Sequence, residues 1–379
     1  MKIAQIVATF PPYHGGMGYV CFHNSRELAL RGHDVTVFTI DYGRLSYKND
    51  PESFKIVRLK TPLVHGDGGM IPQLYSKLKN FDIIHLHYPF FGGAEYVYWA
   101  SLFRRQKYFL TYHMDVYGNT LLKKLIIGAY EPLLMKKIIR RAALIGSPGI
   151  EYLKKSKVGS FIPWNKVVTF PHAGVDIRTF RPRQKDKSLV QKYKLQGKIV
   201  VLFVGNLQPF KGLHILIDAI SRIKDENIVL LVVGGGYGEK TYKRQVKEAG
   251  LEGRVIFAGS KLPDKDLPHY YNLGDFLVLP STHSESFGLV VLEAMASGKP
   301  AIVSSLPGPS QLIEDGTDGL IVKTGDVEDL KNKIEHLAQE RTMREMMGLA
   351  ARKKVVKNYT WENIGKQLEK TLKNIIFLP

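Results

Sequence analysis

Two glutamates, Glu285 and Glu293, stand eight positions apart in a stretch that reads PSTHSESFGLVVLEAMASGKP over residues 280–300. The apolar run before it, residues 276–279, predicts a buried parallel strand. The Ala, Leu and Met content after Gly288 predicts a helix that begins near this glycine and ends at the Gly-Lys-Pro sequence. We therefore expect Glu285 in a loop and Glu293 inside the helix.

The start of this helix is a candidate phosphate site, because Phe287, Gly288 and Leu289 would offer free backbone N–H groups at the positive end of the helix dipole. Glu293, about a turn and a half into the helix, could accept hydrogen bonds from two neighbouring hydroxyls, as a ribose presents. Glu285 would face whatever is attached beyond the phosphates. This arrangement indicates a nucleotide sugar. The competing interpretation is that Glu285 caps the helix and Glu293 is a solvated helix residue.

The stretch resembles the E-x7-E signature of the family 4 retaining glycosyltransferases, the glycosyl transferases group 1 with a GT-B fold. The resemblance implies that Glu285 contacts the donor sugar and Glu293 the ribose. It also implies an α/β fold in which two Rossmann-like domains face a cleft and a C-terminal helix crosses back onto the first domain.

The N-terminal residues predict the opening of a Rossmann-like domain, with a strand over 2–9, a loop over 11–18, a helix to about residue 30 and a second strand. The loop contains Gly15, Gly16 and Gly18, but it is longer than the G-x-G-x-x-G dinucleotide fingerprint and carries two prolines. From the residues alone, tight turning without a ligand fits equally well. The resemblance implies that these glycines lie next to the donor diphosphate.

Three histidines lie on or directly after predicted strands of the same domain. His85 and His87, on a strand over 81–87, stand at i and i+2 as metal ligands could, but no third ligand is evident, which favours buried, hydrogen-bonded side chains. His113 directly follows a strand over 108–112, and ligands of open α/β sheets bind outside the carboxyl ends of strands. It also matches the family's T-x-H motif, which implies a place close to the donor sugar; a purely structural role is the alternative.

A second domain is predicted beyond residue 172, where a segment over 170–180 resembles the family's N-G-V-D-x-x-x-F junction. We expect an acceptor-side domain over 1–172, joined by a C-terminal helix over about 360–379, and a nucleotide-sugar-binding domain over 173–359. Apolar runs predict strands of the second domain over 199–204, 228–233, 255–258, 301–303 and 319–322, and helices over 326–357. Glycines over 234–238 would let a ligand approach the backbone, and a Pro/Gly loop is expected over 306–309.

Lys211 matches the cation of the family pattern G-R-L-x-x-x-K-G, which here reads GNLQPFKG. Asn206 stands where the family has arginine, so one of the two cations that neutralise the diphosphate there is missing. Gln311 stands where the family has glutamate. A catalytically weak or inactive relative that binds a carbohydrate or a partner is therefore the alternative function.

The resemblance implies a retaining hexosyltransferase that moves a sugar from a GDP- or UDP-linked donor to an acceptor hydroxyl. The catalytic residues would be Lys211, Glu285 and His113. The donor would be bound by a wider set of residues, namely Gly15, Gly16, Gly18, Asn206, Phe287, Gly288, Leu289 and Glu293. The nucleotide sugar would be a co-substrate, and no cofactor and no metal are expected.

The composition is that of a soluble protein of two domains, with 379 residues, 44% hydrophobic and 23% charged. The single cysteine, Cys21, excludes an intrachain disulfide and suits a cytosolic location. No signal peptide is evident, and no apolar run reaches the ~20 residues that span a bilayer. We therefore expect a cytoplasmic protein.

The net charge of +19, from 54 Lys and Arg against 35 Asp and Glu, attracts polyanions. No helix-turn-helix, zinc-finger or RNP-like motif appears, so we expect no nucleic-acid partner. Residues 119–143 hold six basic side chains against one acid, interleaved with Leu, Ile and Met. They form either the solvated face of a soluble enzyme or a peripheral contact with an anionic membrane at its cytoplasmic face. A membrane contact would suit a lipid or lipid-linked glycan as acceptor.

Overall fold

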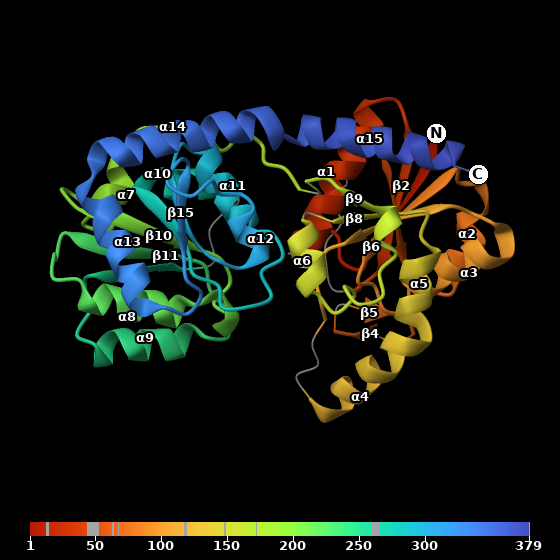
Figure 1. Cartoon of the computed structure of the whole chain (residues 1–379), viewed down its shortest axis with the longest axis horizontal. Helices are drawn as coiled ribbons and strands as arrows, with labels where there is room; N and C mark the ends of the chain where they lie inside the picture. Colours follow the sequence, from red (N-terminus) through yellow and green to blue (C-terminus); the bar gives the residue numbers. More distant parts are fainter. Residues whose placement is uncertain are drawn as a thin grey trace. The chain divides into compact units, whose positions relative to one another are not determined.

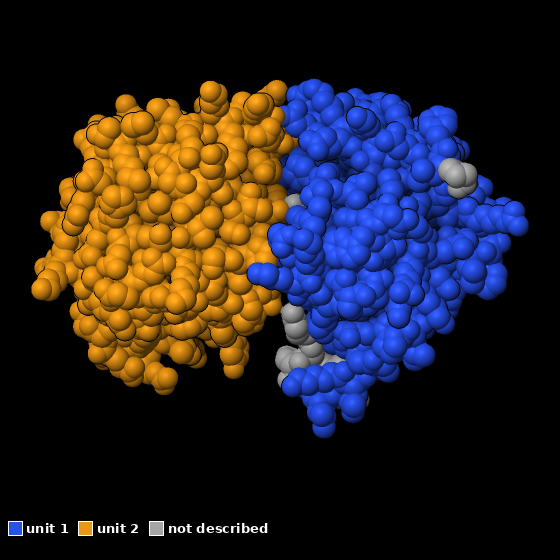
Figure 2. All heavy atoms as spheres, in the orientation of Figure 1, with its two compact units in different colours: residues 1–174, 361–379 blue, residues 175–360 orange. Residues whose placement is uncertain are grey.

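The computed structural model describes residues 1–12, 15–43, 53–62, 64–66, 68–116, 120–147, 149–171, 173–259 and 265–378, without the side chains of residues 64, 65, 122, 123 and 126. The chain forms two compact units, residues 1–174 with 361–379 and residues 175–360 (Figure 2). These divisions lie within two residues of the expected ones, 172/173 and 359/360. His172 and Asn119 lie outside the described residues.

The first unit is built on a seven-stranded parallel sheet of order β3-β2-β1-β6-β7-β8-β9 (Figure 1). Its strands are β1 (Lys2–Ile6), β2 (Asp34–Ile40), β3 (Lys55–Leu59), β6 (Ile83–Tyr88), β7 (Tyr108–Tyr112), β8 (Leu144–Ser147) and β9 (Val167–Thr169). A separate antiparallel pair joins β4 (Val64–His65) to β5 (Gly68–Gly69). The strand order reverses between β1 and β6, which in doubly wound sheets is where ligands bind.

The helices of the first unit are α1 (Gly16–Leu30), α2 (Gln73–Lys77), η1 (Leu78–Asn80), α3 (Ala94–Arg104), α4 (Leu121–Tyr130), η2 (Glu131–Met135), α5 (Lys136–Arg141), α6 (Ile150–Lys155), η3 (Trp164–Lys166) and α15 (Trp361–Phe377). Helices α4 and α5 are separated by η2, a π-helical turn that contains Pro132. Proline lacks the N–H that a regular α-helix needs there.

Helix α15 belongs to the first unit because it packs against α1. A Cβ on Gly365 would lie 2.6 Å from the Cβ of Glu27, so the two helices approach as closely as backbones allow. The ring of Trp361 stacks on His23 with centroids 4.4 Å apart. The C-terminal segment therefore completes the fold of the N-terminal unit.

The expected loop over 11–18 is wrong at its end, because α1 already begins at Gly16. Gly18, which was expected in the loop, is buried in the first turn of the helix, where a Cβ would lie 2.5 Å from the carbonyl oxygen of Thr9. Only glycine lets the first turn of α1 pass this close to the backbone at Thr9, in the segment that follows β1. Its low helix propensity hid the start of the helix in the sequence.

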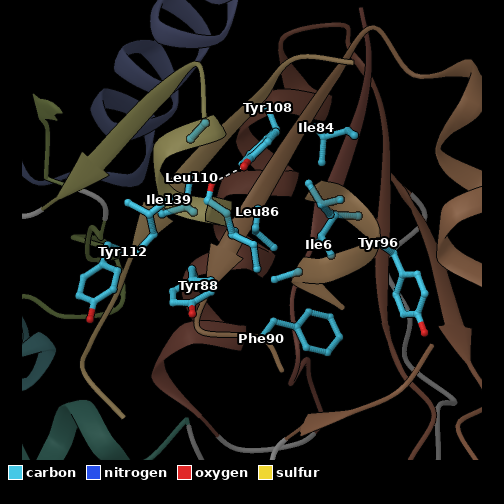
Figure 3. Close-up of a cluster of buried hydrophobic side chains, with 14 of the residues drawn as sticks. Ile6, Ile84, Leu86, Tyr88, Phe90, Tyr96, Tyr108, Leu110, Tyr112 and Ile139 are labelled. Carbon is cyan, nitrogen blue, oxygen red and sulfur yellow. Dashed lines mark hydrogen bonds between the residues drawn. The ribbon is translucent and has the colours of Figure 1, made fainter. Parts of the chain in front are cut away.

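The core of the first unit lies between its central strands and the helices, and it is lined by aliphatic and tyrosine side chains (Figure 3). Ile6, Ile84, Leu86 and Leu110 are fully buried. The hydroxyl of the buried Tyr108 donates a hydrogen bond to the carbonyl oxygen of Ile138, so this polar atom is satisfied inside the core.

The second unit has a six-stranded parallel sheet of order β12-β11-β10-β13-β14-β15. Its strands are β10 (Ile199–Val204), β11 (Ile228–Val233), β12 (Val255–Gly259), β13 (Phe276–Leu279), β14 (Ala301–Ser304) and β15 (Gly319–Val322). Its helices are α7 (Lys187–Lys192), η4 (Pro209–Lys211), α8 (Leu213–Arg222), α9 (Glu239–Glu248), α10 (Leu267–Leu273), α11 (Leu289–Ala296), α12 (Pro307–Ser310), α13 (Val327–Gln339) and α14 (Arg341–Asn358). The order reverses between β10 and β13, as in a Rossmann sheet.

The apolar strand signals of the second unit are confirmed, since the predicted bounds of β10, β11, β13 and β15 agree with the structure. The predicted loop over 306–309 is wrong, because Pro307–Ser310 forms the single-turn helix α12. Its proline at the first helical position, where no N–H is needed, allows this turn. No helix in the described part of the chain is long and apolar enough to span a membrane.

Candidate active site

The central strands β10 and β13 of the second unit end side by side, and each continues into a loop that carries predicted site residues. The N–H of Thr282, after β13, donates to the carbonyl oxygen of Phe210, after β10, at 2.8 Å. A Cβ on Gly212, whose φ is +74°, would lie 2.0 Å from the carbonyl oxygen of Pro280. The two loops therefore pack with direct backbone contact, which glycine permits.

Lys211 and Glu285 form an ion pair between these loops, with Lys211 Nζ 2.5 Å from Glu285 Oε2. The Ser281 hydroxyl donates to the same carboxylate oxygen at 3.3 Å. The side chains are only 17% and 10% exposed, so Lys211 is not an ordinary solvated surface lysine. Two side chains 74 positions apart in sequence are thus in direct contact, at the edge of the sheet where ligands of this fold bind.

Helix α11 begins directly after Gly288, as the sequence predicts, and this glycine has φ +99°. No side-chain hydrogen bond caps the helix, so the interpretation of Glu285 as a helix cap is wrong. Gly308, just after the start of α12, packs under the preceding loop, where a Cβ would lie 2.0 Å from the carbonyl oxygen of Glu285. The first N–H groups of α11 and their dipole therefore start beside the ion pair.

Glu293, in α11, accepts a hydrogen bond from the hydroxyl of Tyr271 through Oε2 at 2.5 Å. Tyr271 comes from α10 and is fully buried. A carboxylate held by a buried tyrosine is a fixed side chain, which contradicts the interpretation of Glu293 as merely solvated. Sequence reasoning missed Tyr271, because nothing in the order of residues indicates that α10 packs beside α11.

Asn206, where a second cation was expected, is exposed. Its neighbour Leu207 donates to the carbonyl oxygen of Gly235 at 3.0 Å. A Cβ on Gly234 would lie 1.8 Å from the carbonyl oxygen of Gly205. We expected a ligand to approach the backbone at the glycines over 234–238. At Gly234 the backbone of Gly205 makes this close approach instead. The amide of Gln311, the other departure from the family pattern, donates to the carbonyl oxygen of Gly308 at 2.8 Å.

In the first unit, His85, His87 and His113 are buried and hydrogen-bonded, as the sequence predicts for the first two. His113 directly follows β7 and donates its backbone N–H to Tyr88 at 2.9 Å. His87 Nδ1 lies 2.9 Å from His113 Nε2, and His85 Nε2 lies 2.8 Å from the hydroxyl of Thr111. The contact between His87 and His113 was not predicted.

The contact of His87 with Gln5 indicates which ring nitrogens carry protons in the hydrogen-bonded series Gln5, His87 and His113. His87 Nε2 lies 3.0 Å from Gln5 Oε1, which can only accept a hydrogen bond. His87 Nε2 therefore donates, and in the neutral ring Nδ1 accepts the N–H of His113 Nε2. Gln5 on β1 and His87 on β6 thus determine which nitrogen of His113 carries its proton.

Gly15, Gly16 and Gly18 also belong to the first unit, where Gly15 is the N-terminal cap residue of α1 in an extended conformation. Gly15 and Gly16 are exposed, whereas Gly18 is buried. Their role in donor binding stays a prediction. Among the residues that the structure describes, no group of three or more His, Cys, Asp or Glu side chains is placed to hold a metal ion.

Comparison with known proteins agrees with this architecture. The family model of the glycosyl transferases group 1 matches residues 184–354, and that of Glycosyltransferase Family 4 matches residues 14–149. The chain is a family 4 glycosyltransferase. It is 25% identical to spore coat protein SA of Bacillus subtilis, over 97% of this chain and 98% of that protein. It is 33% identical to a D-inositol 3-phosphate glycosyltransferase of Corynebacterium aurimucosum, over 55% of this chain and 51% of that protein.

Solved structures show that this glycosyltransferase has the GT-B fold. The crystal structure of Anabaena HepE in complex with UDP matches 99% of this chain and 100% of that chain, with a TM-score of 0.81 and 21% identity. Sucrose-phosphate synthase from Thermosynechococcus elongatus matches 99% of this chain and 98% of that chain, with a TM-score of 0.77 and 22% identity.

The buried histidines generate a prediction about pH. Burial, and then the charge of His113, lower the pKa of His85 from 6.5 to about 3. Between these values the unfolded chain binds a proton that the folded chain does not, so stability falls as the pH drops below 6.5. At pH 5.0 this effect amounts to roughly 2 kcal/mol. When the pH is lowered from 7.5 to 5.0, the free energy of unfolding of the His85→Gln variant should therefore fall by about 2 kcal/mol less than that of the wild type.

Urea unfolding followed by tryptophan fluorescence measures this difference, because the three tryptophans, Trp99, Trp164 and Trp361, all lie in the first unit. The control is His336→Gln, at an exposed position in α13, which should keep the pH dependence of the wild type. An equal loss of stability in His85→Gln and the wild type would show that His85 is not the group that titrates.

Proposed function

We propose that this glycosyltransferase moves a hexose from a GDP- or UDP-linked donor to an acceptor hydroxyl, with retention at the anomeric carbon. The observation that carries the proposal is the half-buried ion pair between Lys211 and Glu285 beside the start of α11. A cation and uncapped helix N–H groups suit a diphosphate, and a neighbouring carboxylate suits sugar hydroxyls.

In the proposed reaction, Lys211 and the N–H groups at Phe287, Gly288 and Leu289 stabilise the charge that develops on the departing diphosphate. The low exposure of Lys211 and Glu285 strengthens such electrostatic effects relative to those in water. A phosphate oxygen of the leaving group takes the proton of the acceptor hydroxyl. Lys211 supplies a charge that a metal supplies in other transferases, so the proposal requires no metal and no further cofactor.

Glu293 binds the ribose in this proposal, and Tyr271 orients it. The tyrosine hydroxyl occupies one lone pair of Oε2, and a carboxylate has about four such sites. Glu285 binds the hydroxyls of the transferred sugar, and His113 contacts the same sugar as the family resemblance implies. The three glycines Gly15, Gly16 and Gly18 and the exposed Asn206 would complete the donor site.

The comparisons support a nucleotide-sugar donor. Anabaena HepE has been solved with UDP and with UDP-glucose. The relative in Corynebacterium aurimucosum is a D-inositol 3-phosphate glycosyltransferase. A catalytically weak or inactive relative is the second candidate, because Asn206 supplies no charge where the family has arginine. Donor hydrolysis or transfer by the wild type distinguishes the two functions.

The acceptor is proposed to be a lipid or lipid-linked glycan, reached from the cytoplasmic membrane face. In the segment formed by α4, η2 and α5, the apolar side chains of Leu121, Leu125 and Leu133 are 76%, 63% and 61% exposed. Basic side chains on the same segment are also exposed, namely Lys124, Lys137, Arg140 and Arg141. Exposed leucines among cations are typical of a surface that binds anionic membranes.

The first prediction of this proposal concerns the ribose. Glu293→Gln should weaken nucleotide-sugar binding by about 1–3 kcal/mol, and Tyr271→Phe by about 0.5–1.5 kcal/mol, because a charged partner contributes more than a neutral one. Isothermal titration with UDP-glucose and GDP-mannose measures both. Glu252→Gln, at an exposed position of the same unit, is the matched control. Unchanged affinity in Glu293→Gln would remove Glu293 from the donor site.

The second prediction concerns the leaving group. Lys211→Ala should lower kcat by about 100-fold or more, because a charge stabiliser positioned for the transition state is lost. Lys240→Ala, which removes an exposed lysine of α9, should leave kcat unchanged. Circular dichroism checks that both variants stay folded. A folded Lys211→Ala enzyme with nearly full turnover would contradict the assigned role.

The third prediction concerns the membrane. Each Lys near an anionic surface contributes about 1 kcal/mol, so changing Lys123, Lys124, Lys136 and Lys137 to Glu should reduce co-sedimentation with anionic vesicles at least tenfold. The wild type and the variant should both bind neutral vesicles much more weakly than the wild type binds anionic vesicles. A control with equal charge reversal in the second unit, at exposed Lys187, Lys224, Lys240 and Lys247, should bind as the wild type does. If the wild type stays in the supernatant at physiological salt, the acceptor is soluble.

A further inference from the structure

A polar cavity of about 390 Å³ opens in the second unit, and it is lined by residues that the candidate donor site does not use. Its lining includes Ile199 at the start of β10, Asp275 just before β13, and Lys299 just before β14. These positions are the amino ends of the strands, whereas Lys211 and Glu285 follow the carboxyl ends. Four to six residues of strand separate the two edges, roughly 13–20 Å at about 3.3 Å per residue. The cavity is therefore distinct from the donor site.

Positive charge dominates this cavity. Its charged lining residues are the four cations Lys198, Lys299, Arg341 and Arg344 and the two acids Asp275 and Glu345, which leaves a net charge of +2. Both acids are already engaged. Asp275 accepts from Lys185 Nζ at 2.9 Å with each oxygen, and Glu345 accepts from Arg341 at 2.9 Å. Lys198 donates to the carbonyl oxygen of Glu226 and to Asn227, and Arg344 donates to the carbonyl oxygens of Leu337 and Ala338. The cations that line the cavity therefore exceed its carboxylates, and these two are held by neutral acceptors.

Lys299 is the clearest of these cations. It is partly buried, and among the described residues its ammonium takes part in no hydrogen bond or ion pair within 4 Å. Burial, and then the repulsion of Lys185 and Arg344, lower its pKa, although Asp275 acts in the opposite direction. A partly buried ammonium among other cations is costly without an anion beside it.

The helix that borders the cavity adds to the same field. Helix α14 begins at Arg341 and has no acidic residue in its first turn. Helix starts usually carry acidic residues, because these complement the positive end of the dipole. Here Arg341 and Arg344 occupy the first turn, after Glu340 at the N-terminal cap position, so a bound anion would meet side-chain cations together with the helix dipole.

We infer that this cavity binds a small phosphate monoester, such as a sugar phosphate, at a site separate from the nucleotide-sugar donor. The dianionic phosphate would lie against Lys299 and Arg341, where it would share the Arg341 guanidinium with Glu345 and balance the net charge of +2 of the lining. The volume is about a dozen times that of a water molecule, which leaves room for a body beyond the phosphate. This site does not depend on the proposed transfer reaction.

Isothermal titration of the full-length enzyme with glucose 6-phosphate, at constant ionic strength, tests the inference. We expect saturable binding that is at least roughly tenfold weaker in the double variant Lys299→Gln, Arg341→Gln, because two charged partners are lost. Lys247→Ala, at an exposed position in α9, should bind as the wild type does. Lys211→Ala should also keep this binding, because Lys211 belongs to the donor site.

A second measurement uses the wild type alone, so it does not depend on the folding of a variant. Glucose 6-phosphate should slow the acetylation of Lys299, read by mass spectrometry, and leave that of Lys247 unchanged; glucose should protect neither. The inference is overturned if the wild type shows no saturable binding and no protection of Lys299. It is also overturned if binding is lost in Lys211→Ala and kept in the double variant, because the ligand would then occupy the donor site.

Discussion

The ion pair between Lys211 and Glu285 is the contact on which the candidate active site depends. It joins the loop after β10 to the loop after β13, and its two side chains are mostly withdrawn from water. Removing one partner of such a pair leaves an uncompensated charge, which is far more costly than the net stabilisation from the pair. The backbone contact of Gly212 with Pro280 holds the two loops close enough for the pair to form, and Gly308 of α12 packs against the carbonyl oxygen of Glu285.

This constraint also bears on the proposed phosphate chemistry of a site that has Asn206 where the family has arginine. Asn206 is exposed, so its side chain does not replace the missing arginine by burial or by contact with Glu285. The uncapped start of α11 supplies partial positive charge next to the ion pair. In the proposed reaction, a single lysine held by the ion pair and a helix dipole would act on the same phosphate without any rearrangement, which is the condition for effective electrostatic stabilisation.

Much of the fold could be predicted because buried parallel strands are continuous apolar runs. The bounds of β7, β10, β11, β13 and β15 followed from such runs alone. The edge strands β3 and β9 were missed, since their residues are only partly buried and their sequences mix apolar and polar side chains. The start of α1 was missed because a glycine needed for close packing at Gly18 weakens the helix signal.

Candidate site residues such as Lys211, Glu285 and Glu293 could be proposed from the sequence, but Tyr271 and the contacts between these side chains could not. The pairs Lys211–Glu285, Tyr271–Glu293 and His87–His113 are separated by 74, 22 and 26 positions. Only the order of strands in the sheet brings such residues together. For the histidines, the register of β6 against β7 places His87 opposite Thr111. His113, two positions beyond Thr111, therefore lies on the same face of the sheet as His87.

The net charge of +19 illustrates why composition alone could not locate function. Exposed cations such as those of α5 are screened over about 10 Å at 0.1 M salt. Partly buried Lys211 and Lys299 are screened much less, and each stands near the start of a helix, α11 or α14 respectively. Both proposed anion sites therefore use partly buried cations, for which burial favours a neighbouring anion. The larger exposed charge determines which polyanionic surfaces the protein meets before any specific contact forms.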